Sequence, residues 1–243
     1  MIDVLWSGGG LLAVDKPAGM AVIPGRTDAG GPPLRARLEA QLGRRIWIVH
    51  RLDRDTSGVL LVALDAEAHR AASVAFEEGQ IDKWYLALVS PPLAAPVRID
   101  APLAPARRAR MRVARPGETG KPAATELEPL ETFGDVALVQ ARPLTGRTHQ
   151  VRVHLRHAGS PLLVDPQYGR PEPIGARRLG GGDDRVVLAR TPLHAARLLL
   201  PGSAGLPAAD IRAPLAPDVA TALALLRQRT SKGSDTPTLF TRS

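Results

Sequence analysis

The stretch WIVHRLDRDTSGVLLVAL occupies residues 47–64, and it predicts a strand, a sharp connection and a second strand. The apolar opening at 47–49 is typical of a short strand. The apolar run at 59–64 has the length and composition of a strand that is buried on both faces. Between the two lies HRLDRDTSG, residues 50–58, where threonine, serine and glycine can form the hydrogen bonds of a tight turn.

The connection between these strands concentrates charge. Arg51 and Arg54 flank Asp53, and Asp55 follows directly. Neighbouring guanidinium groups favour the ionised form of a carboxylate, so Asp53 or Asp55 is expected to act as a charged nucleophile or base at neutral pH. The competing interpretation is a surface salt-bridge cluster in an ordinary turn, and for this string taken alone that interpretation is the stronger one.

The flanking sequence predicts more regular structure around this centre. Leucines recur every four residues over 34–42 before Gly43, which predicts a short amphipathic helix with a glycine stop. A second helix is predicted over 66–79, also closed by glycine. Further strands are predicted at 11–14, 83–89, 125–130, 136–142 and 186–188.

Composition points to a nucleic-acid partner. The 243 residues carry 32 Lys plus Arg against 24 Asp plus Glu, a formal net charge of +8, and only four of the basic residues are lysines. The planar fork of arginine suits phosphates and guanine edges, although a general bias toward arginine on a solvated surface would give the same count. The absence of cysteine excludes disulfides, thiolate nucleophiles and cysteine metal sites. Three Trp, two Tyr and three Phe are too few for an RNA-recognition sheet with several stacking rings.

A run of arginines follows a proline-rich stretch in the middle of the chain. Residues 107–112 read RRARMR, and Arg115 lies just beyond them. Such a run is usually a flexible solvated loop. We nevertheless expect it to contact nucleic acid through Arg108 and Arg110, because a basic hairpin beside a cleft is an effective phosphate clamp.

A second motif, TGRTHQVRVH, occupies residues 145–154. It predicts a helix over 150–157 with Thr148 near the N-cap. Its plain interpretation is a capped basic helix at the surface. Its histidines lack the spacing of a metal site and have no matching carboxylate or cysteine, so we expect no metal.

The length and 44% hydrophobic content predict one compact domain over residues 1–230. A last amphipathic helix is predicted over 215–229, and the polar tail at 231–243 is expected to be disordered. No apolar stretch reaches the roughly 20 residues of a membrane helix, and the opening MIDVLWSGGG lacks the pattern of a secretion signal. We therefore expect a cytoplasmic protein with no membrane contact, and a monomer.

Taken together, five motifs resemble those of the RluA-type pseudouridine synthases, in the order that this family has them. They are VDKPAGM at 14–20, HRLDRDTSG at 50–58, KWYLALV at 83–89, GRTHQVRVHL at 146–155 and LHA at 193–195. The resemblance implies an α+β fold built on a central, mostly antiparallel sheet with flanking helices and a catalytic cleft across it. It further implies isomerisation of uridine to pseudouridine in structured RNA, ribosomal or transfer, without a cofactor.

The resemblance also implies roles for individual residues. In this family the aspartate of the first signature is catalytic, a tyrosine of the K-x-Y strand lies against the target base, and the arginine of G-R-T-H-Q pairs with the catalytic aspartate. These positions correspond to Asp53, Tyr85 and Arg147. The residues expected to contact the RNA substrate are His50, Arg51, Arg54, Thr56, Lys16, Arg108 and Arg110.

The sequence departs from the family pattern in two places. Val164 stands where the family commonly has a glycine before Asp165, which puts the local turn in doubt. Many relatives also carry an N-terminal S4-type RNA-binding module, whereas the motifs here begin near residue 11, so we expect a catalytic domain that grips RNA by itself.

Two other functional classes compete with this interpretation. A non-catalytic RNA-binding or ribosome-assembly factor could keep the same fold as a scaffold. A glycosidase or nucleosidase would release free base and normally needs a second catalytic carboxylate, for which Asp55 is the nearest candidate.

Overall fold

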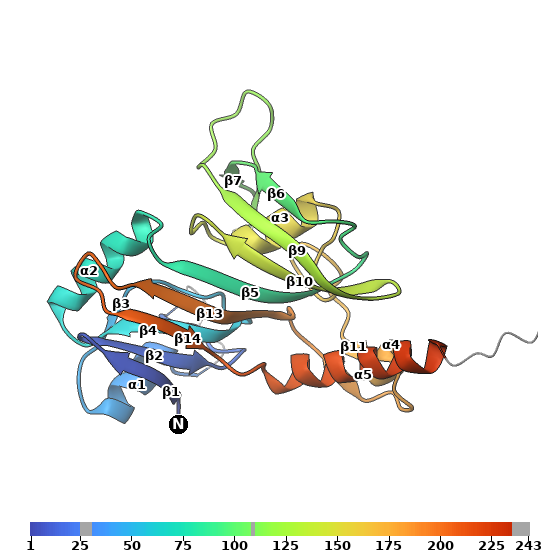
Figure 1. Cartoon of the computed structure of the whole chain (residues 1–243), viewed down its shortest axis with the longest axis horizontal. Helices are drawn as coiled ribbons and strands as arrows, with labels where there is room; N and C mark the ends of the chain where they lie inside the picture. The colour runs from blue at the N-terminus through green and yellow to red at the C-terminus, as the bar shows by residue number, and fades with distance from the viewer. Residues whose placement is uncertain (25–30, 108–109, 235–243) are drawn as a thin grey trace, which may run out of the picture.

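The computed structural model describes residues 1–24, 31–107 and 110–234, and within these ranges ten strands form one large sheet. Its strands are β1 (Asp3–Gly8), β2 (Leu11–Lys16), β3 (Trp47–Ile48), β4 (Ser57–Ala63), β5 (Asp82–Val89), β6 (Val97–Asp100), β9 (Ala124–Phe133), β10 (Val136–Pro143), β13 (Leu193–Pro201) and β14 (Ala208–Arg212). They are ordered β1-β2-β4-β13-β5-β10-β9-β6, with β14 paired to β13 and β3 to β4 (Figure 1). Only β4 and β13 pair in parallel; the other pairs of this sheet are antiparallel.

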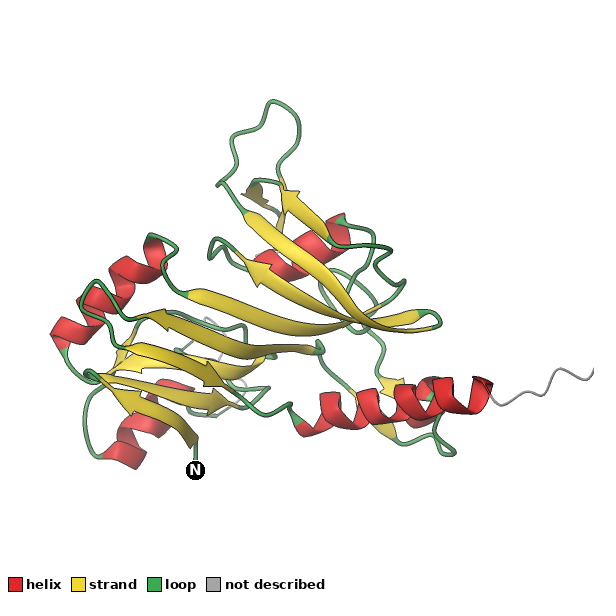
Figure 2. Cartoon of the chain, viewed as in Figure 1, coloured by secondary structure: helices red, strands yellow, loops and turns green. Residues whose placement is uncertain are grey.

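Helices lie on both sides of this sheet (Figure 2). They are α1 (Leu34–Leu42), α2 (Ala66–Glu77), α3 (Gln150–His157), α4 (Ala176–Leu179) and α5 (Pro217–Ser234). Two small antiparallel pairs complete the described part of the chain: β7 (Leu103–Pro105) with β8 (Met111–Val113), and β11 (Ile174–Gly175) with β12 (Val186–Leu188). The predicted α+β class with a central, mostly antiparallel sheet is confirmed.

Strand β4 is buried along its whole length because helices cover it from two sides. Val59 and Leu61 belong to the core that also contains the buried alanines of α2. Leu60 and Val62 alternate with them and pack in a second core with Leu34 and Leu38 of α1. The continuous apolar sequence of this strand is therefore the consequence of burial on both faces.

The other half of the sheet has the same layered arrangement. Val139 of β10 packs in one core with Val151 and Leu155 of α3, while Leu138 packs in another with α5. Tyr85 of β5 contacts both the α1 core and the α3 core. The junction between the two halves of the sheet thus lies at Tyr85.

The boundaries differ from the predicted ones in informative places. The N-cap of α3 is His149, directly after Thr148, as the prediction of Thr148 near the N-cap implies, and His149 adopts a left-handed conformation with φ 56°. The last helix continues to Ser234, past the predicted end at 229, so the first residues of the predicted tail are helical. The rest of that tail, 235–243, lies outside the described residues. The arginine-rich stretch lies mainly in the segment between β7 and β8, where a loop was expected: Arg107 and Arg110 belong to neither strand, Arg112 lies in β8, and residues 108–109 lie outside the described residues.

Gly58 allows β4 to approach β13 closely enough for the parallel pairing. Its φ is 108°, and a Cβ atom added there would lie 2.2 Å from the backbone oxygen of Ala195, its partner on β13. No side chain fits at such a distance. The close contact also fixes the strand that directly follows the charged connection.

We predict that Gly58→Ala lowers the free energy of unfolding by about 3 kcal/mol or more, because it adds a backbone clash to an unfavourable φ. Gly43→Ala is the matched control: its φ of 64° is also left-handed, but no atom lies within 4 Å of the added Cβ. That variant should lose only about 1 kcal/mol. Chemical denaturation measures both, and equal losses would contradict the close-approach explanation.

Candidate active site

The guanidinium group of Arg152 joins two aspartates that are far apart in the sequence. Its Nη1 donates to Asp53 Oδ2 at 3.0 Å, while Nε and Nη2 donate to the two oxygens of Asp165, each at 2.8 Å. The group also lies 4.9 Å from the centre of the Tyr168 ring. Burial opposes the charge of Arg152, but its hydrogen bond to Asp165 and the charges of both aspartates raise its pKa. Asp53 therefore faces a permanent cation on α3.

This geometry corrects the pairing implied for Arg147. Arg147 is exposed, and its Nε donates to the carbonyl oxygen of Pro122 at 3.0 Å. The ion pair with Asp53 is made by Arg152, five residues further along the same motif. Arg147 nevertheless lines the same two cavities as Asp53, so the two side chains border one site.

The turn that carries Asp53 is held from two directions. The backbone N–H of Thr56 donates to the carbonyl of Asp53 at 3.1 Å and closes the turn. On one side of the turn, the fully buried Lys16 of β2 donates from Nζ to the carbonyl of Arg54 at 2.9 Å. From the other side, Arg190 Nη1 donates to the carbonyl of Asp55 at 2.8 Å. These contacts come from β2 and from the segment before β13.

Among the described residues, Lys16 binds three carbonyl groups and no carboxylate. Besides Arg54, its Nζ donates to the carbonyls of Pro17 and Met20, each at 2.8 Å. Burial lowers the pKa of Lys16 to about 7, against the opposing charges of nearby aspartates. Lys16 therefore shapes the floor of the site, and it is covered rather than open to a substrate.

The ring of His149 lies between Tyr168 and Asp53. The backbone N–H of Met111 can only donate, and it does so to Tyr168 Oη at 2.8 Å. The hydroxyl proton of Tyr168 is then free to bond to Nδ1 of His149, 2.7 Å away. Burial lowers the pKa of His149, which favours the neutral ring. The other ring nitrogen, Nε2, faces Asp53 Oδ1 at 3.8 Å.

Two adjoining cavities meet at Asp53. A broad groove of about 1230 Å³ contains His50, Arg51, Arg54 and Arg147 in its walls. A small pocket of about 70 Å³ is lined by Thr56, Tyr85 and Arg152, among others. Asp53, Arg147 and His149 border both cavities. A polymer could lie in the groove while one of its units enters the pocket.

Tyr85 lies in the wall of the small pocket. Burial raises the pKa of Tyr85, and the charge of Asp53 adds to this effect. The phenol is therefore protonated at neutral pH. It offers the pocket an aromatic face and a hydroxyl donor, not a phenolate base.

The structure distributes the predicted RNA-contact residues unevenly. Arg51 and Arg54 are exposed in the groove, although Arg54 Nε is bound to the Gly19 carbonyl at 3.0 Å. His50 is structural: its Nε2 accepts the Leu61 N–H at 3.0 Å, and burial lowers its pKa to about 3. Thr56 is 1% exposed, and its Oγ1 has no hydrogen-bond partner within the described residues. Arg110 lies on the β7–β8 hairpin and borders neither cavity, and Arg108 falls outside the described residues.

The sequence interpretation missed Arg152 and Arg190 as site residues. Arg152 lies inside the predicted helix 150–157, three positions after His149, and this spacing is the signal in the sequence that groups the two residues. Asp165 forms the predicted turn despite the valine before it, since its Oδ1 accepts the backbone N–H groups of Gln167 and Tyr168. Val164 is fully buried in the α5 core. No such signal in the sequence indicates Arg190.

Two general properties limit what the described residues can do. No three of their His, Asp or Glu side chains gather in an arrangement that would hold a metal ion. His154 instead bonds to Thr125 Oγ1 at 2.8 Å and to the Ala101 carbonyl at 3.0 Å. Among the described helices, none has the length and apolar character needed to cross a membrane.

Comparison with known proteins identifies similar sequences and folds. A family model described as RNA pseudouridylate synthase matches residues 10–157. The chain is 41% identical over 207 residues to ribosomal large subunit pseudouridine synthase D of Nitrosomonas europaea, covering 82% of this chain and 58% of that protein. It is 36% identical over 219 residues to synthase C of Vibrio cholerae, covering 90% and 67%. The human RNA pseudouridylate synthase domain-containing protein 1 has a similar structure, with a TM-score of 0.68, 27% identity and 98% and 96% coverage.

We predict that Arg152→Met lowers the free energy of unfolding by about 3–5 kcal/mol, because it leaves the buried Asp165 carboxylate without its cation. Arg142→Met is the matched control. Arg142 also contacts two carboxylates, Asp82 and Glu126, but all three side chains are at least one-third exposed. Its loss should cost about 1 kcal/mol or less in urea denaturation. Similar costs for the two variants would contradict the structural role of the buried network.

Proposed function

The chain belongs to the RluA-type RNA pseudouridylate synthase family, and we propose that it isomerises uridine to pseudouridine in large-subunit ribosomal RNA with Asp53 as the catalytic carboxylate. The observation that carries this proposal is the ion pair between Asp53 and Arg152 at a small pocket that Tyr85 also lines. The names of the two bacterial relatives support the choice of RNA. The chain spans 58% and 67% of the length of those relatives, so this substrate is part of the proposal.

The reaction explains why an ionised carboxylate is needed. The C1′–N1 bond of uridine breaks, the uracil rotates, a C1′–C5 bond forms, and the proton on C5 is replaced by one on N1, so that all atoms stay in the product. Positive charge develops at C1′ as the first bond breaks, and a nearby carboxylate stabilises or traps it. Arg152 holds the Asp53 carboxylate in place for this task through the hydrogen bond from Nη1 to Oδ2. A covered pocket retains the detached base and excludes water, which would otherwise release free uracil.

Tyr85 is suited to the last proton transfer only in combination with Asp53. The raised pKa of Tyr85 keeps its phenol protonated. The phenol oxygen can therefore accept the C5 proton only if its own hydroxyl proton is transferred to another group at the same time. Asp53, whose charge acts on Tyr85, is the carboxylate available to receive that proton. The ring itself provides a stacking surface for uracil.

A target uridine must leave its stack to reach this pocket, at a cost of a few kcal/mol. The exposed arginines of the groove, Arg51, Arg54 and Arg147, are available to contact phosphates and offset that cost. The β7–β8 hairpin, with Arg110, is available to contact RNA further from the pocket. A cytoplasmic location, a monomeric state and a transfer-RNA substrate stay predictions of the sequence.

Two alternative functions make different demands on the site. A hydrolase that releases free base would normally use a second carboxylate, but Asp55 borders neither cavity. A non-catalytic RNA-binding factor does not need an oriented carboxylate at a pocket. Pseudouridine mapping in ribosomal and transfer RNA, with and without the gene, distinguishes all of these outcomes.

We predict that Asp53→Asn abolishes tritium release from RNA that contains 5-tritiated uridine, with a loss of at least about 1000-fold. The amide keeps the shape of the side chain but not its charge. RNA binding should stay within about threefold of wild type, because RNA is held mainly through its phosphates.

Asp55→Asn is the control for this variant. It removes a carboxylate from the same turn, outside both cavities, and should leave turnover unchanged. Substantial turnover by the Asp53 variant would overturn the assignment. Free uracil as the product of the wild-type protein would instead favour the hydrolase.

We predict that Tyr85→Phe lowers kcat by roughly 100-fold or more while KM changes little, because the ring still stacks but the proton relay is lost. Single-turnover kinetics on the same tritiated RNA measure the effect. Unchanged turnover would remove the Tyr85 hydroxyl from the mechanism and leave the residue a purely stacking role.

A further inference from the structure

Lys83 is a buried cation whose charge no group of the described chain neutralises. The residue is only 8% exposed, and burial lowers its pKa. No described carboxylate lies within 4 Å of its Nζ; the contact it makes is with the ring of Phe76, 5.7 Å away. Asp82, the acidic group that opposes the effect of burial, is itself bound by Arg142 at 2.8 Å.

The other buried lysine shows how unusual this arrangement is. Lys16 satisfies its ammonium group with three carbonyl oxygens at 2.8–2.9 Å. Lys83 has no hydrogen-bond acceptor within the described part of the chain. The Nζ atom of Lys83 is not fully enclosed, and Lys83 lines the broad groove, so a ligand in the groove can supply the missing acceptor.

The surroundings of Lys83 leave its ammonium group open to the broad groove. Lys83 borders that groove together with Arg51, Asp53 and Arg147. Gly146 lies directly opposite: a Cβ atom there would be 4.0 Å from Nζ, and the backbone of Gly146 is not left-handed, so its conformation does not demand glycine. The missing side chain therefore leaves space in front of the cation.

The position on β5 relates this cation to the proposed reaction site. Lys83 and Tyr85 are two residues apart on one strand, so both side chains project from the same face, about 7 Å apart along it. That separation is comparable to the length of one nucleotide. A uridine lying against Tyr85 would therefore have its own or its neighbour's phosphate within reach of Lys83.

We propose that Lys83 binds one backbone phosphate of the RNA, at or directly next to the nucleotide that enters the pocket beside Asp53. The inference rests on the proposed function in that it takes RNA as the occupant of the groove. A phosphate oxygen supplies the acceptor and the negative charge that Lys83 lacks in the free protein. Binding at this site couples the grip on the backbone to the placement of one nucleotide against Tyr85.

Lys83→Met tests the proposal, with Lys83→Gln as a second variant that removes the charge but keeps a polar end. The probe is unmodified large-subunit ribosomal RNA transcribed in overlapping fragments. We expect about tenfold weaker binding, and a plot of log affinity against log salt whose slope is smaller by about 0.7–0.9, as for one lost phosphate contact. The melting temperature should be unchanged or higher, because no ion pair is lost.

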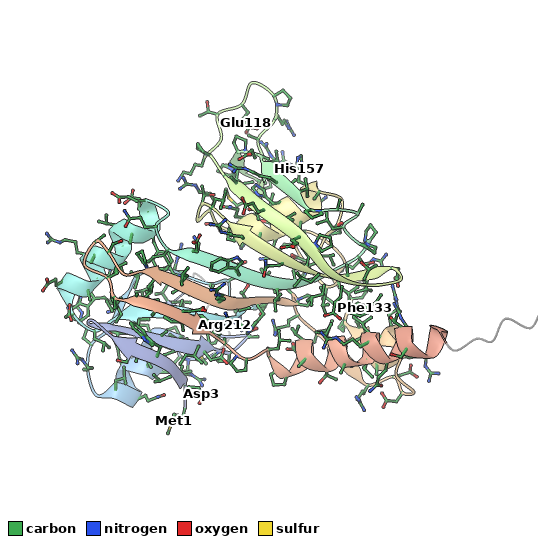
Figure 3. All side chains as sticks on the ribbon, in the orientation of Figure 1. Met1, Asp3, Glu118, Phe133, His157 and Arg212 are labelled. Carbon is green, nitrogen blue, oxygen red and sulfur yellow. The ribbon has the colours of Figure 1, made fainter. Side chains whose placement is uncertain are left out.

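Arg212→Met is the matched control, since it also removes one positive charge. Arg212 lies on β14 (Figure 3). Its side chain is 67% exposed, and it borders neither the broad groove nor the small pocket. Its effect on affinity should be less than about twofold. An equal loss in this variant would mean that Lys83 acts only through net charge and would overturn the site.

Ethylation interference locates the contact. RNA phosphates are ethylated at random, and the fragments that still bind are sequenced. Wild-type protein should reject ethylation at a phosphate that the Lys83→Met variant tolerates, and this phosphate should flank the uridine that becomes pseudouridine. Identical interference patterns, or a difference far from that uridine, would overturn the proposal. Failure to form any pseudouridine in the same RNA would instead count against the proposed function.

Discussion

The site depends on a single buried guanidinium. Arg152 holds Asp53 and Asp165 at once, and the second aspartate is as important as the first because it fixes the orientation of the cation. Asp165 in turn accepts two backbone N–H groups of its own turn, which makes the support rigid. A charge pair of this kind adds little net stability, since desolvation offsets most of the attraction. The pair instead fixes the position of the Asp53 carboxylate at the wall of the small pocket.

The two halves of the sheet meet where this pair forms. The turn with Asp53 belongs to the half covered by α1 and α2, whereas Arg152 belongs to α3 on the other half. The parallel pairing of β4 with β13, permitted by Gly58, places the end of the turn beside the strand that also pairs with β5. Because Lys16 and Arg190 bind carbonyls of the turn from both sides, it has little freedom to move away from α3. The geometry of the site is thus a property of the whole sheet.

The basic side chains of the site differ in the hydrogen-bond acceptors that the protein itself provides for them, and this difference separates structural residues from residues that can bind a ligand. Lys16 bonds to carbonyls and Arg152 to carboxylates, so both are complete in the free protein. Arg147 is exposed and bound at one nitrogen only, and Lys83 is buried without an acceptor among the described residues. Lys16 and Arg152 hold the structure of the site together, whereas Arg147 and Lys83 can still bind a ligand. In a protein with a net charge of +8, the location of unsatisfied charge is more informative than its amount.

Local sequence determined the helices and strands whose apolar residues recur with a regular period. It also drew attention to one short charged motif, residues 50–58. The bounds of α1 and α3 and the buried strand β4 follow from patterns within about ten neighbouring residues, whereas the role expected for Asp53 came from the resemblance of five motifs along the chain. The local patterns do not reveal which arginine pairs with Asp53. Arg147 and Arg152 lie in the same motif, and their order along the chain does not show where their side chains point. Only the packing of α3 on the sheet turns Arg152 toward a partner 99 residues away and leaves Arg147 at the surface. The cap at His149, the support from Arg190 and the unpaired Lys83 are decided in the same way, since long-range contacts have no signature in local spacing.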